Sequence, residues 1–184
     1  MIREKCVYSG TKIQDIYCIP QVPIFCGCVE NIEQYKYEDL IFSISDNGLI
    51  QIKNLIQLED LYKNNHNDSV GSVWEKHHVS FSEFISPIIQ NKKVFEYGGA
   101  SGKLYNLCQT ENKDWTIIDF NPMLESKNKL NVLAGDASNF FDESYEVYVS
   151  SHFLEHLYEP FLFLEKLRNI KKNGIHAFSI PNQK

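Results

Sequence analysis

The stretch VFEYGGASG, residues 94–102, decides the fold of this chain. It begins with an apolar run, continues through Glu96, and then places three glycines, Gly98, Gly99 and Gly102, within five residues. The apolar run predicts a buried strand, and the glycines predict a turn that reaches positive φ and leaves room for a ligand. A helix that begins after this turn would offer free N–H groups to that ligand.

The sequence after residue 92 alternates apolar strands with helical stretches. The predicted strands are KVFEYGG, WTIIDF, KLNVLAGD, YEVYVSS and GIHAFSIPN, and the predicted helices are SGKLYNLCQ and EPFLFLEKLRNI. Strands that are apolar along their whole length, separated by helices, are typical of a parallel sheet covered on both faces. We therefore expect an α/β fold in which residues 92–184 form a doubly wound, mostly parallel sheet of five strands. Ligands of such sheets bind at the carboxyl ends of the strands.

Residues 1–68 have a different character and predict a small, irregular, β-rich module. The segments YCIPQVPIFCGC and LIFSISDNGLIQI read as short strands and turns. Pro20 and Pro23 are expected to break strand pairing, and Asp46-Asn47-Gly48 predicts a turn between two apolar runs.

Residues 69–91 predict a helix that bridges the two halves and packs its apolar face on the second. Pro87 is expected to kink this helix or to end it early. The residues expected on its apolar face are Val70, Val73, Trp74, His77, Phe81, Phe84, Ile85 and Ile88.

Composition restricts the classes of partner. The chain has 184 residues, a formal net charge of −6 and no long run of lysine or arginine, so we expect a small-molecule substrate and no nucleic acid. The N-terminus lacks the apolar core of a secretory signal, and no stretch approaches the roughly 18 to 20 apolar residues of a membrane helix. Five cysteines, odd in number and unevenly spaced, are typical of reduced thiols. We therefore expect a cytoplasmic protein with no membrane partner.

The spacing of the glycines separates two classes of cofactor. Dinucleotide enzymes use G-x-G-x-x-G with the pyrophosphate at the helix N-terminus, whereas this turn reads Glu96-x-Gly98-x-x-x-Gly102. This spacing disfavours a dinucleotide cofactor.

Together these residues resemble the class I S-adenosylmethionine-dependent methyltransferases. Residues 96–102 are similar to the first motif of that family, E/D-x-G-x-G-x-G, with Ala100 in place of the middle glycine. The resemblance implies a Rossmann-like fold and S-adenosylmethionine as the cofactor, with Asp119 accepting hydrogen bonds from the ribose hydroxyls and Asp136 facing the adenine amino group. The cofactor-binding residues that it implies are Glu96, Gly98, Gly99, Gly102, Asp119, Asp136 and Ala137.

His152 and His156 are the candidate catalytic residues. If the fourth predicted strand ends near Ser151, His152 lies at its carboxyl end beside the cofactor, and His156 is expected to share its helical face. Methyl transfer requires that the reactants be positioned and that a proton leave the nucleophile, and histidine is a suitable base near neutral pH. For His156, a packing or capping role within LEHL is the stronger alternative.

A narrower resemblance links both halves of the chain. Residues 49–85 followed by VFEYGGASGKL are similar to the linker and cofactor core of the sugar C-methyltransferases, which carry an N-terminal zinc-binding module with two C-x-x-C pairs. Here Ser9 stands where the partner of Cys6 is expected, and the second pair is replaced by Ile44-Ser45-Asp46-Asn47. Cys26-x-Cys28 has an atypical spacing for zinc, so we expect free cysteines and no bound metal.

This resemblance implies a methyltransferase acting on a sugar nucleotide or a related small glycan precursor. In that family two further strands follow the fifth, whereas this chain ends at Lys184. The alternative is therefore a shortened, non-catalytic relative that binds the cofactor or a partner protein. We also expect a second copy of the chain, or another protein, to cover the open edge of the fifth strand.

Overall fold

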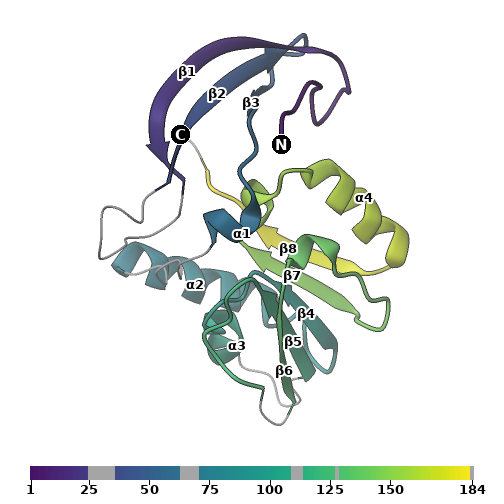
Figure 1. Ribbon diagram of the computed structural model, residues 1–184. Coiled ribbons are helices and arrows are strands. Elements are labelled where there is room, and N and C mark those ends of the chain that lie inside the picture. Colours follow the sequence, from purple (N-terminus) through teal and green to yellow (C-terminus); the bar gives the residue numbers. More distant parts are fainter. Residues whose placement is uncertain (25–35, 63–70, 109–113, 127–128, 183–184) are drawn as a thin grey trace. The chain divides into compact units, whose positions relative to one another are not determined.

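A computed structural model gives the fold of the chain (Figure 1) and describes residues 1–24, 36–62, 71–108, 114–126 and 129–182. The chain divides into two compact units, Met1–Asn67 and Asp68–Lys184. Within the described residues, none of the helices has the length and the apolar character that crossing a membrane requires.

The first unit is built on a three-stranded antiparallel sheet in the order β1-β2-β3. Its elements are β1 (Ile13–Pro23), β2 (Tyr37–Ser45), β3 (Ile50–Ile52) and the short helix α1 (Leu58–Leu61). Asp46-Asn47-Gly48 lies in the turn between β2 and β3, and Gly48 has φ +83°, a backbone conformation that favours glycine. The predicted turn is therefore confirmed.

The expectation that the prolines of β1 break its pairing is confirmed at Pro20 and wrong at Pro23, which pairs with Tyr37 of β2. Pairing with β2 slips between Ile19 and Val22, where Gln21 has φ 52° and donates its N–H to Asp39 Oδ1 at 2.9 Å. Pro20 lies inside this irregularity, and a proline is tolerated there because a bulge removes the need for a ladder N–H.

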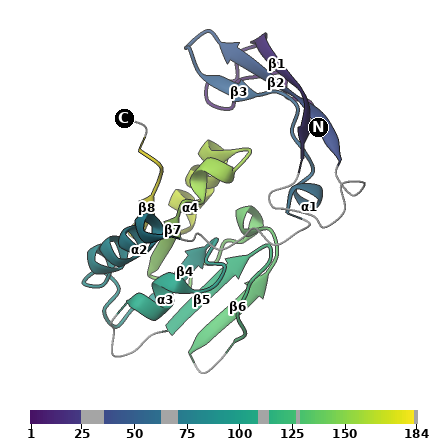
Figure 2. The same ribbon diagram turned by 90° about the vertical axis from the view of Figure 1, so that its left-hand side faces the viewer.

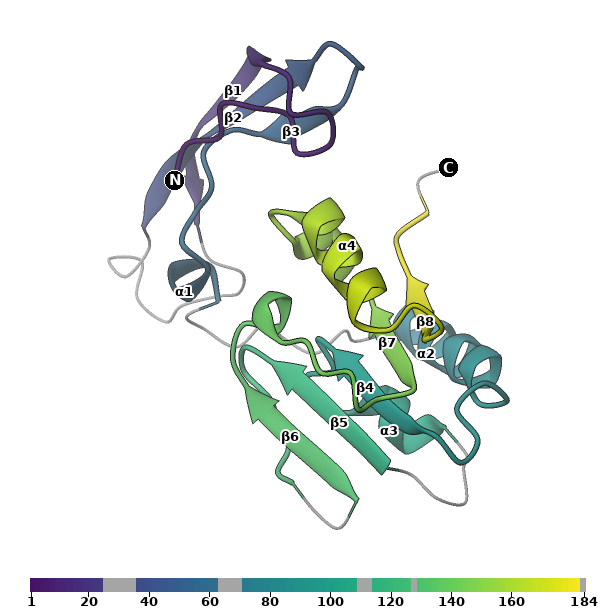
Figure 3. The same ribbon diagram turned by 90° about the vertical axis from the view of Figure 1, so that its right-hand side faces the viewer.

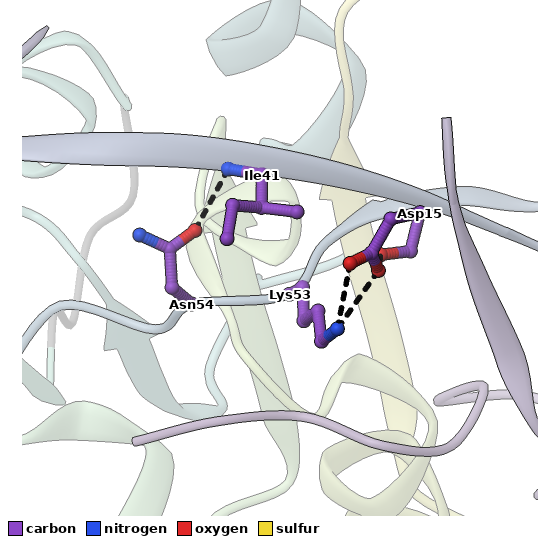
Figure 4. Close-up of polar contacts among 5 residues, drawn as sticks. Asp15, Ile41, Lys53 and Asn54 are labelled. Carbon is purple, nitrogen blue, oxygen red and sulfur yellow. Dashed lines mark hydrogen bonds and ion pairs between the residues drawn. The ribbon is translucent and has the colours of Figure 1, made fainter. Parts of the chain in front are cut away.

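Polar side chains after β3 connect back to the other two strands (Figure 4). Lys53 Nζ donates to both carboxylate oxygens of Asp15 at 2.9 and 2.8 Å, and Asn54 Oδ1 accepts the N–H of Ile41 at 2.8 Å. Hydrogen bonds from Lys53, and then from Ser43, lower the pKa of Asp15 below its ordinary value. These bonds fix the course of the chain as it leaves the sheet.

The second unit is a five-stranded parallel sheet in the order β6-β5-β4-β7-β8, which Figure 3 shows strand by strand. Its strands are β4 (Lys93–Tyr97), β5 (Asp114–Asp119), β6 (Leu130–Ala134), β7 (Val147–Ser151) and β8 (Ile175–Ser179). Its helices are α2 (Ser72–Ile85), α3 (Lys103–Leu107) and α4 (Pro160–Ile170), with 3₁₀ turns at Ala137–Asn139 and Leu154–His156. The predicted α/β fold with a five-stranded parallel sheet is confirmed, and it is consistent with a Rossmann-like fold.

The chain enters the sheet at β4 in the middle, adds β5 and β6 on one side, and then adds β7 and β8 on the other. Such a reversal of direction opens a crevice at the carboxyl ends of the two central strands, and ligands of this class of sheet bind there. The turn after β4 and the segment after β7 therefore lie where a site is expected.

Two apolar cores cover the two faces of the sheet. Alternate residues of β4 supply one core each, because successive side chains of a strand point to opposite faces. Val94 packs with residues of α2 and α3, whereas Phe95 packs with residues of α4. Figure 2 shows α2 and α3 next to each other on their face of the sheet, and the two helices are in contact.

Helix α2 is shorter than expected and buries a narrower face. It begins at Ser72, after Gly71 with φ +102°, and ends at Ile85, two residues before Pro87. Val73 and Phe84 are 79% and 61% exposed, so their place on the buried face was predicted wrongly. Only the C-terminal half of the helix is buried against the sheet. The spacing of apolar residues does not indicate which turns of a helix are buried. Val70 lies outside the described residues.

Candidate functional site

The turn after β4 has the positive φ angles that its glycines predict. Gly98 and Gly102 have φ +71° and +70°, which residues with a side chain rarely adopt. The N–H of Gly98 donates to the carbonyl oxygen of Ile118 at 2.8 Å, which continues the ladder between β4 and β5 into the turn. Ala100, at the position of the missing middle glycine, has φ +35° and therefore carries strain.

Gly99 is required for a different reason, close packing. A Cβ atom at this residue would lie 2.7 Å from Ile117 Cγ2 and 2.8 Å from Glu96 Cδ. Both neighbours are buried in the sheet beneath the turn. A Cβ at Gly98 would meet Phe153 Cδ2 at 3.0 Å, so the turn also touches the segment that follows β7.

Gly99→Ala is expected to destabilise the second unit by about 1 to 3 kcal/mol, because the added methyl group has no space between Ile117 and Glu96. Ala100→Gly in the same turn is the matched control, and it should be neutral or stabilising by up to about 1 kcal/mol, because it relieves a strained φ. Urea unfolding of both variants measures these changes. Equal destabilisation by the two variants would contradict the packing argument.

Glu96 is buried beneath the turn, with 3% of its surface exposed. Its Oε2 atom accepts a hydrogen bond from Trp115 Nε1 at 2.8 Å. The pKa of Glu96 is raised from 4.5 to about 7, mainly by burial and to a smaller extent by Asp119, against the opposing effect of the bond from Trp115. The carboxyl group thus supports the turn from inside the core, and its contact with a cofactor stays a prediction.

Asp119 ends β5 and joins two loops. Its Oδ2 atom accepts the N–H of Ala100 at 3.1 Å, and its Oδ1 atom accepts the N–H of Asn121 at 2.9 Å. A carboxylate can accept about four hydrogen bonds, so each oxygen keeps capacity for a further donor. Asp119 can therefore accept hydroxyl groups while it holds the glycine turn in place.

Asp136 caps the 3₁₀ turn after β6. Its Oδ1 atom accepts from the N–H of Ser138 at 2.9 Å and from its hydroxyl at 2.7 Å, and its Oδ2 atom accepts from Asn139 Nδ2 at 2.7 Å. Ala137 is buried in the core that faces α4. These local bonds account for an acid at this position, and the predicted adenine contacts of Asp136 and Ala137 stay predictions.

His152 directly follows the last residue of β7, as expected. Its backbone is strained at φ 51°, and its N–H donates to the carbonyl oxygen of Ser179 in β8 at 3.1 Å. Its Nδ1 atom lies 3.0 Å from Glu155 Oε1. The side chains of His152 and Glu155 are 21% and 27% exposed, and their hydrogen bond is open to water. Sequence reasoning did not single out Glu155.

His77 of α2 is a second imidazole at the same place, and sequence reasoning counted it only as part of an apolar helix face. Its Nε2 atom lies 2.9 Å from Ser151 Oγ and 3.4 Å from Ser179 Oγ. Burial, and then the neighbouring His152 and His78, lower the pKa of His77 below its ordinary value.

The rings of Trp74 and His77 both lie against His152, with centroid separations of 4.8 and 4.7 Å. We refer to Trp74, His77, His152 and Glu155 as the imidazole cluster. The ends of β7 and β8 and one turn of α2 bring its members together.

His156 occupies a different environment from His152. The expected helical face shared by the two is wrong, because the segment forms only a 3₁₀ turn over Leu154–His156 and His152 precedes it. The N–H of His156 donates to the carbonyl oxygen of Phe153 at 3.0 Å, and the residue is exposed. Its catalytic role stays a prediction.

Three cysteines lie in the described residues: Cys6 and Cys108 are buried, and Cys18 is exposed. Cys26 and Cys28, the C-x-C pair, lie outside the described residues. The N–H of Ser9 donates to Cys6 Sγ at 3.5 Å, so the serine that replaces the expected cysteine contacts the remaining thiol. Across the described residues, no cluster of three or more histidine, cysteine or acidic side chains is suited to hold a metal ion.

The site thus combines a glycine turn, an acid that holds it, and an imidazole of lowered pKa, His77, next to the imidazole–carboxylate pair of His152 and Glu155. Backbone N–H groups, carboxylate oxygens and imidazole nitrogens can bind a polar organic ligand and move a proton. A comparison with models of known protein families gives no match for this chain, and neither does a comparison with curated proteins.

Proposed function

We propose that the chain is an S-adenosylmethionine-dependent methyltransferase acting on a sugar nucleotide or a related small glycan precursor. One observation carries the proposal: the turn after the central strand β4 is held by Asp119, an acid at the end of the adjacent parallel strand β5. The substrate class rests on the sequence similarity described above.

The chemistry of the available donors and acceptors fits this cofactor better than a dinucleotide. Asp119 keeps acceptor capacity on both carboxylate oxygens, which suits the two hydroxyls of a ribose. Helix α3 has only five residues and its N-cap residue is Gly102 in the left-handed conformation, so it offers little dipole for a pyrophosphate. When bound, S-adenosylmethionine supplies an electrophilic methyl group on a sulfonium.

The residues of the chain have three tasks in this reaction. The glycine turn and Asp119 hold the cofactor, and Asp136 with Ala137 are proposed to border its adenine. The segment after β7 receives the substrate, because Phe153 contacts Gly98 and so lies beside the turn. His152 and His156 are the candidate bases on that segment.

Isothermal titration calorimetry with S-adenosylhomocysteine and with NAD tests the proposal. We expect S-adenosylhomocysteine to bind at one site per chain and NAD to give no binding heat. Binding of NAD without binding of S-adenosylhomocysteine would refute the proposed cofactor. Binding of S-adenosylhomocysteine without turnover of S-adenosylmethionine against a panel of sugar nucleotides would favour the non-catalytic alternative.

A further inference from the structure

The imidazole cluster lies next to the glycine turn. His152 is the first residue after β7, and β7 pairs with β4, whose end carries the turn. The next residue, Phe153, stacks on Tyr97 of β4 with a centroid separation of 5.7 Å and borders Gly98. A substrate that meets a cofactor held by the turn is therefore close to His152.

Glu155 fixes which nitrogen of His152 carries the proton. A carboxylate accepts hydrogen bonds, so the contact of 3.0 Å between Glu155 Oε1 and His152 Nδ1 requires hydrogen on Nδ1. In the neutral imidazole this leaves the lone pair on Nε2. The pair has the arrangement of a histidine base oriented by an acid, in which the second nitrogen takes up the proton.

The imidazole of His77 packs against the imidazole of His152. Ser151 Oγ lies 2.9 Å from His77 Nε2 and accepts the hydroxyl hydrogen of Ser179 at 3.2 Å. A proton on His77 would oppose a proton on His152, whose ring lies 4.7 Å away. Burial, and then the neighbouring His152 and His78, lower the pKa of His77, so this imidazole takes up a proton less readily than an ordinary histidine.

We propose that His152 accepts a proton from the nucleophilic atom of the substrate, a hydroxyl or an acidic C–H, and that Glu155 and His77 are its positioning residues. The inference rests on the proposed function and adds the class of nucleophile to it. In the transfer, the X–H bond of the substrate breaks, its electron pair forms the bond to the methyl carbon, and the proton goes to His152 Nε2. The electrons of the broken carbon–sulfur bond stay on sulfur.

The groups that face His152 come from three elements. Helix α2 contributes His77 and, beyond it, His78, whose Nδ1 atom is 2.7 Å from the carbonyl oxygen of Trp74. The segment after β7 contributes Glu155, and β8 contributes the carbonyl oxygen and the hydroxyl of Ser179.

Nitrogen-15 NMR of the imidazoles in the cofactor-free protein tests the assignment without any substrate. At pH 7 we expect His152 in the tautomer with hydrogen on Nδ1, and we expect His77 to take up its proton at a lower pH than an ordinary histidine does. Glu155→Ala should shift His152 toward the Nε2–H form, whereas Glu155→Gln, which keeps an acceptor oxygen, should preserve the Nδ1–H form. A wild-type His152 with hydrogen on Nε2 would overturn the proposal.

Activity provides the second readout. His152→Asn should lower kcat by about 100-fold or more, because a positioned base contributes about 10² to 10⁴, while affinity for S-adenosylhomocysteine stays unchanged. Asparagine tolerates the positive φ of this position, so the variant should fold. Asp114→Ala, at the exposed start of β5 and outside the candidate site, is the control and should retain kcat within about twofold.

The outcomes separate the two proposals. Full turnover by His152→Asn, with cofactor binding intact, would refute the base and leave the proposed function standing. Failure of the wild-type chain to bind S-adenosylhomocysteine would refute the proposed function, and with it the role of His152 in methyl transfer, even if NMR shows the expected tautomer.

Discussion

Glu96→Gln is expected to remove a pH dependence of stability worth about 3 kcal/mol between pH 4.5 and pH 8. The pKa of Glu96 is about 7 in the folded chain and 4.5 as its ordinary value, mainly because the carboxyl group is buried. Between these values the folded state holds a proton that the unfolded state has released. The free energy of unfolding therefore falls as the pH rises from about 4.5 to about 7. Above pH 7 it stays lower by the full cost of burying the charged carboxylate.

Glutamine keeps an acceptor for Trp115 Nε1 but buries two amide hydrogens, which offsets part of the gain. We expect the variant to be about 1 to 2 kcal/mol more stable than the wild type at pH 8 and less stable at pH 5. Urea unfolding at both values measures the difference by tryptophan fluorescence, since both tryptophans, Trp74 and Trp115, lie in the second unit. Parallel pH profiles for wild type and variant would show that Glu96 is charged in the folded chain.

Asp119→Ala is expected to weaken binding of S-adenosylhomocysteine by about 1 to 3 kcal/mol, or about 5- to 150-fold. The substitution removes a charged acceptor for two ribose hydroxyls and also releases the N–H groups of Ala100 and Asn121. Calorimetry of the folded variant measures the loss. Asp114→Ala, at the exposed opposite end of β5, is the control and should bind as the wild type does.

Affinity equal to that of the wild type in folded Asp119→Ala would remove Asp119 from the site. A loss of the same size in Asp114→Ala would show that the effect is a general response of β5. Circular dichroism and unfolding midpoints of both variants distinguish lost contacts from lost structure.

The strands of the second unit could be predicted because a strand that is buried on both faces is apolar along its whole length. In β5, Ile117 and Ile118 point to opposite faces, yet 0% and 4% of their surfaces are exposed. The turn after β4 was equally readable, since two of its glycines occupy positive φ. The buried part of α2 could not be predicted, because its exposed apolar residues have the same spacing as its buried ones.

The partners of the site residues could not be predicted. His77 meets Ser151 and Ser179 across 74 and 102 residues of sequence, so only the folded sheet brings them together. Glu96 resembles the acid of a cofactor motif, but its carboxyl group lies in the core, where it accepts a hydrogen bond from the indole N–H of Trp115 on β5. Local patterns give the position of such side chains on the backbone, whereas their contacts depend on neighbouring strands.

The irregular pairing of β1 has a consequence for the behaviour of the protein at high concentration. Among the described strands of its sheet, β1 lies at one edge, and it carries the exposed side chains Ile16 and Ile19, so its outer edge could pair with another chain. Pro20 and Pro23 have no N–H to offer an incoming strand, and the N–H of Gln21 is already bonded to Asp39. Stacking of neighbouring molecules along the second half of this edge is therefore disfavoured, so the two prolines protect the protein against aggregation.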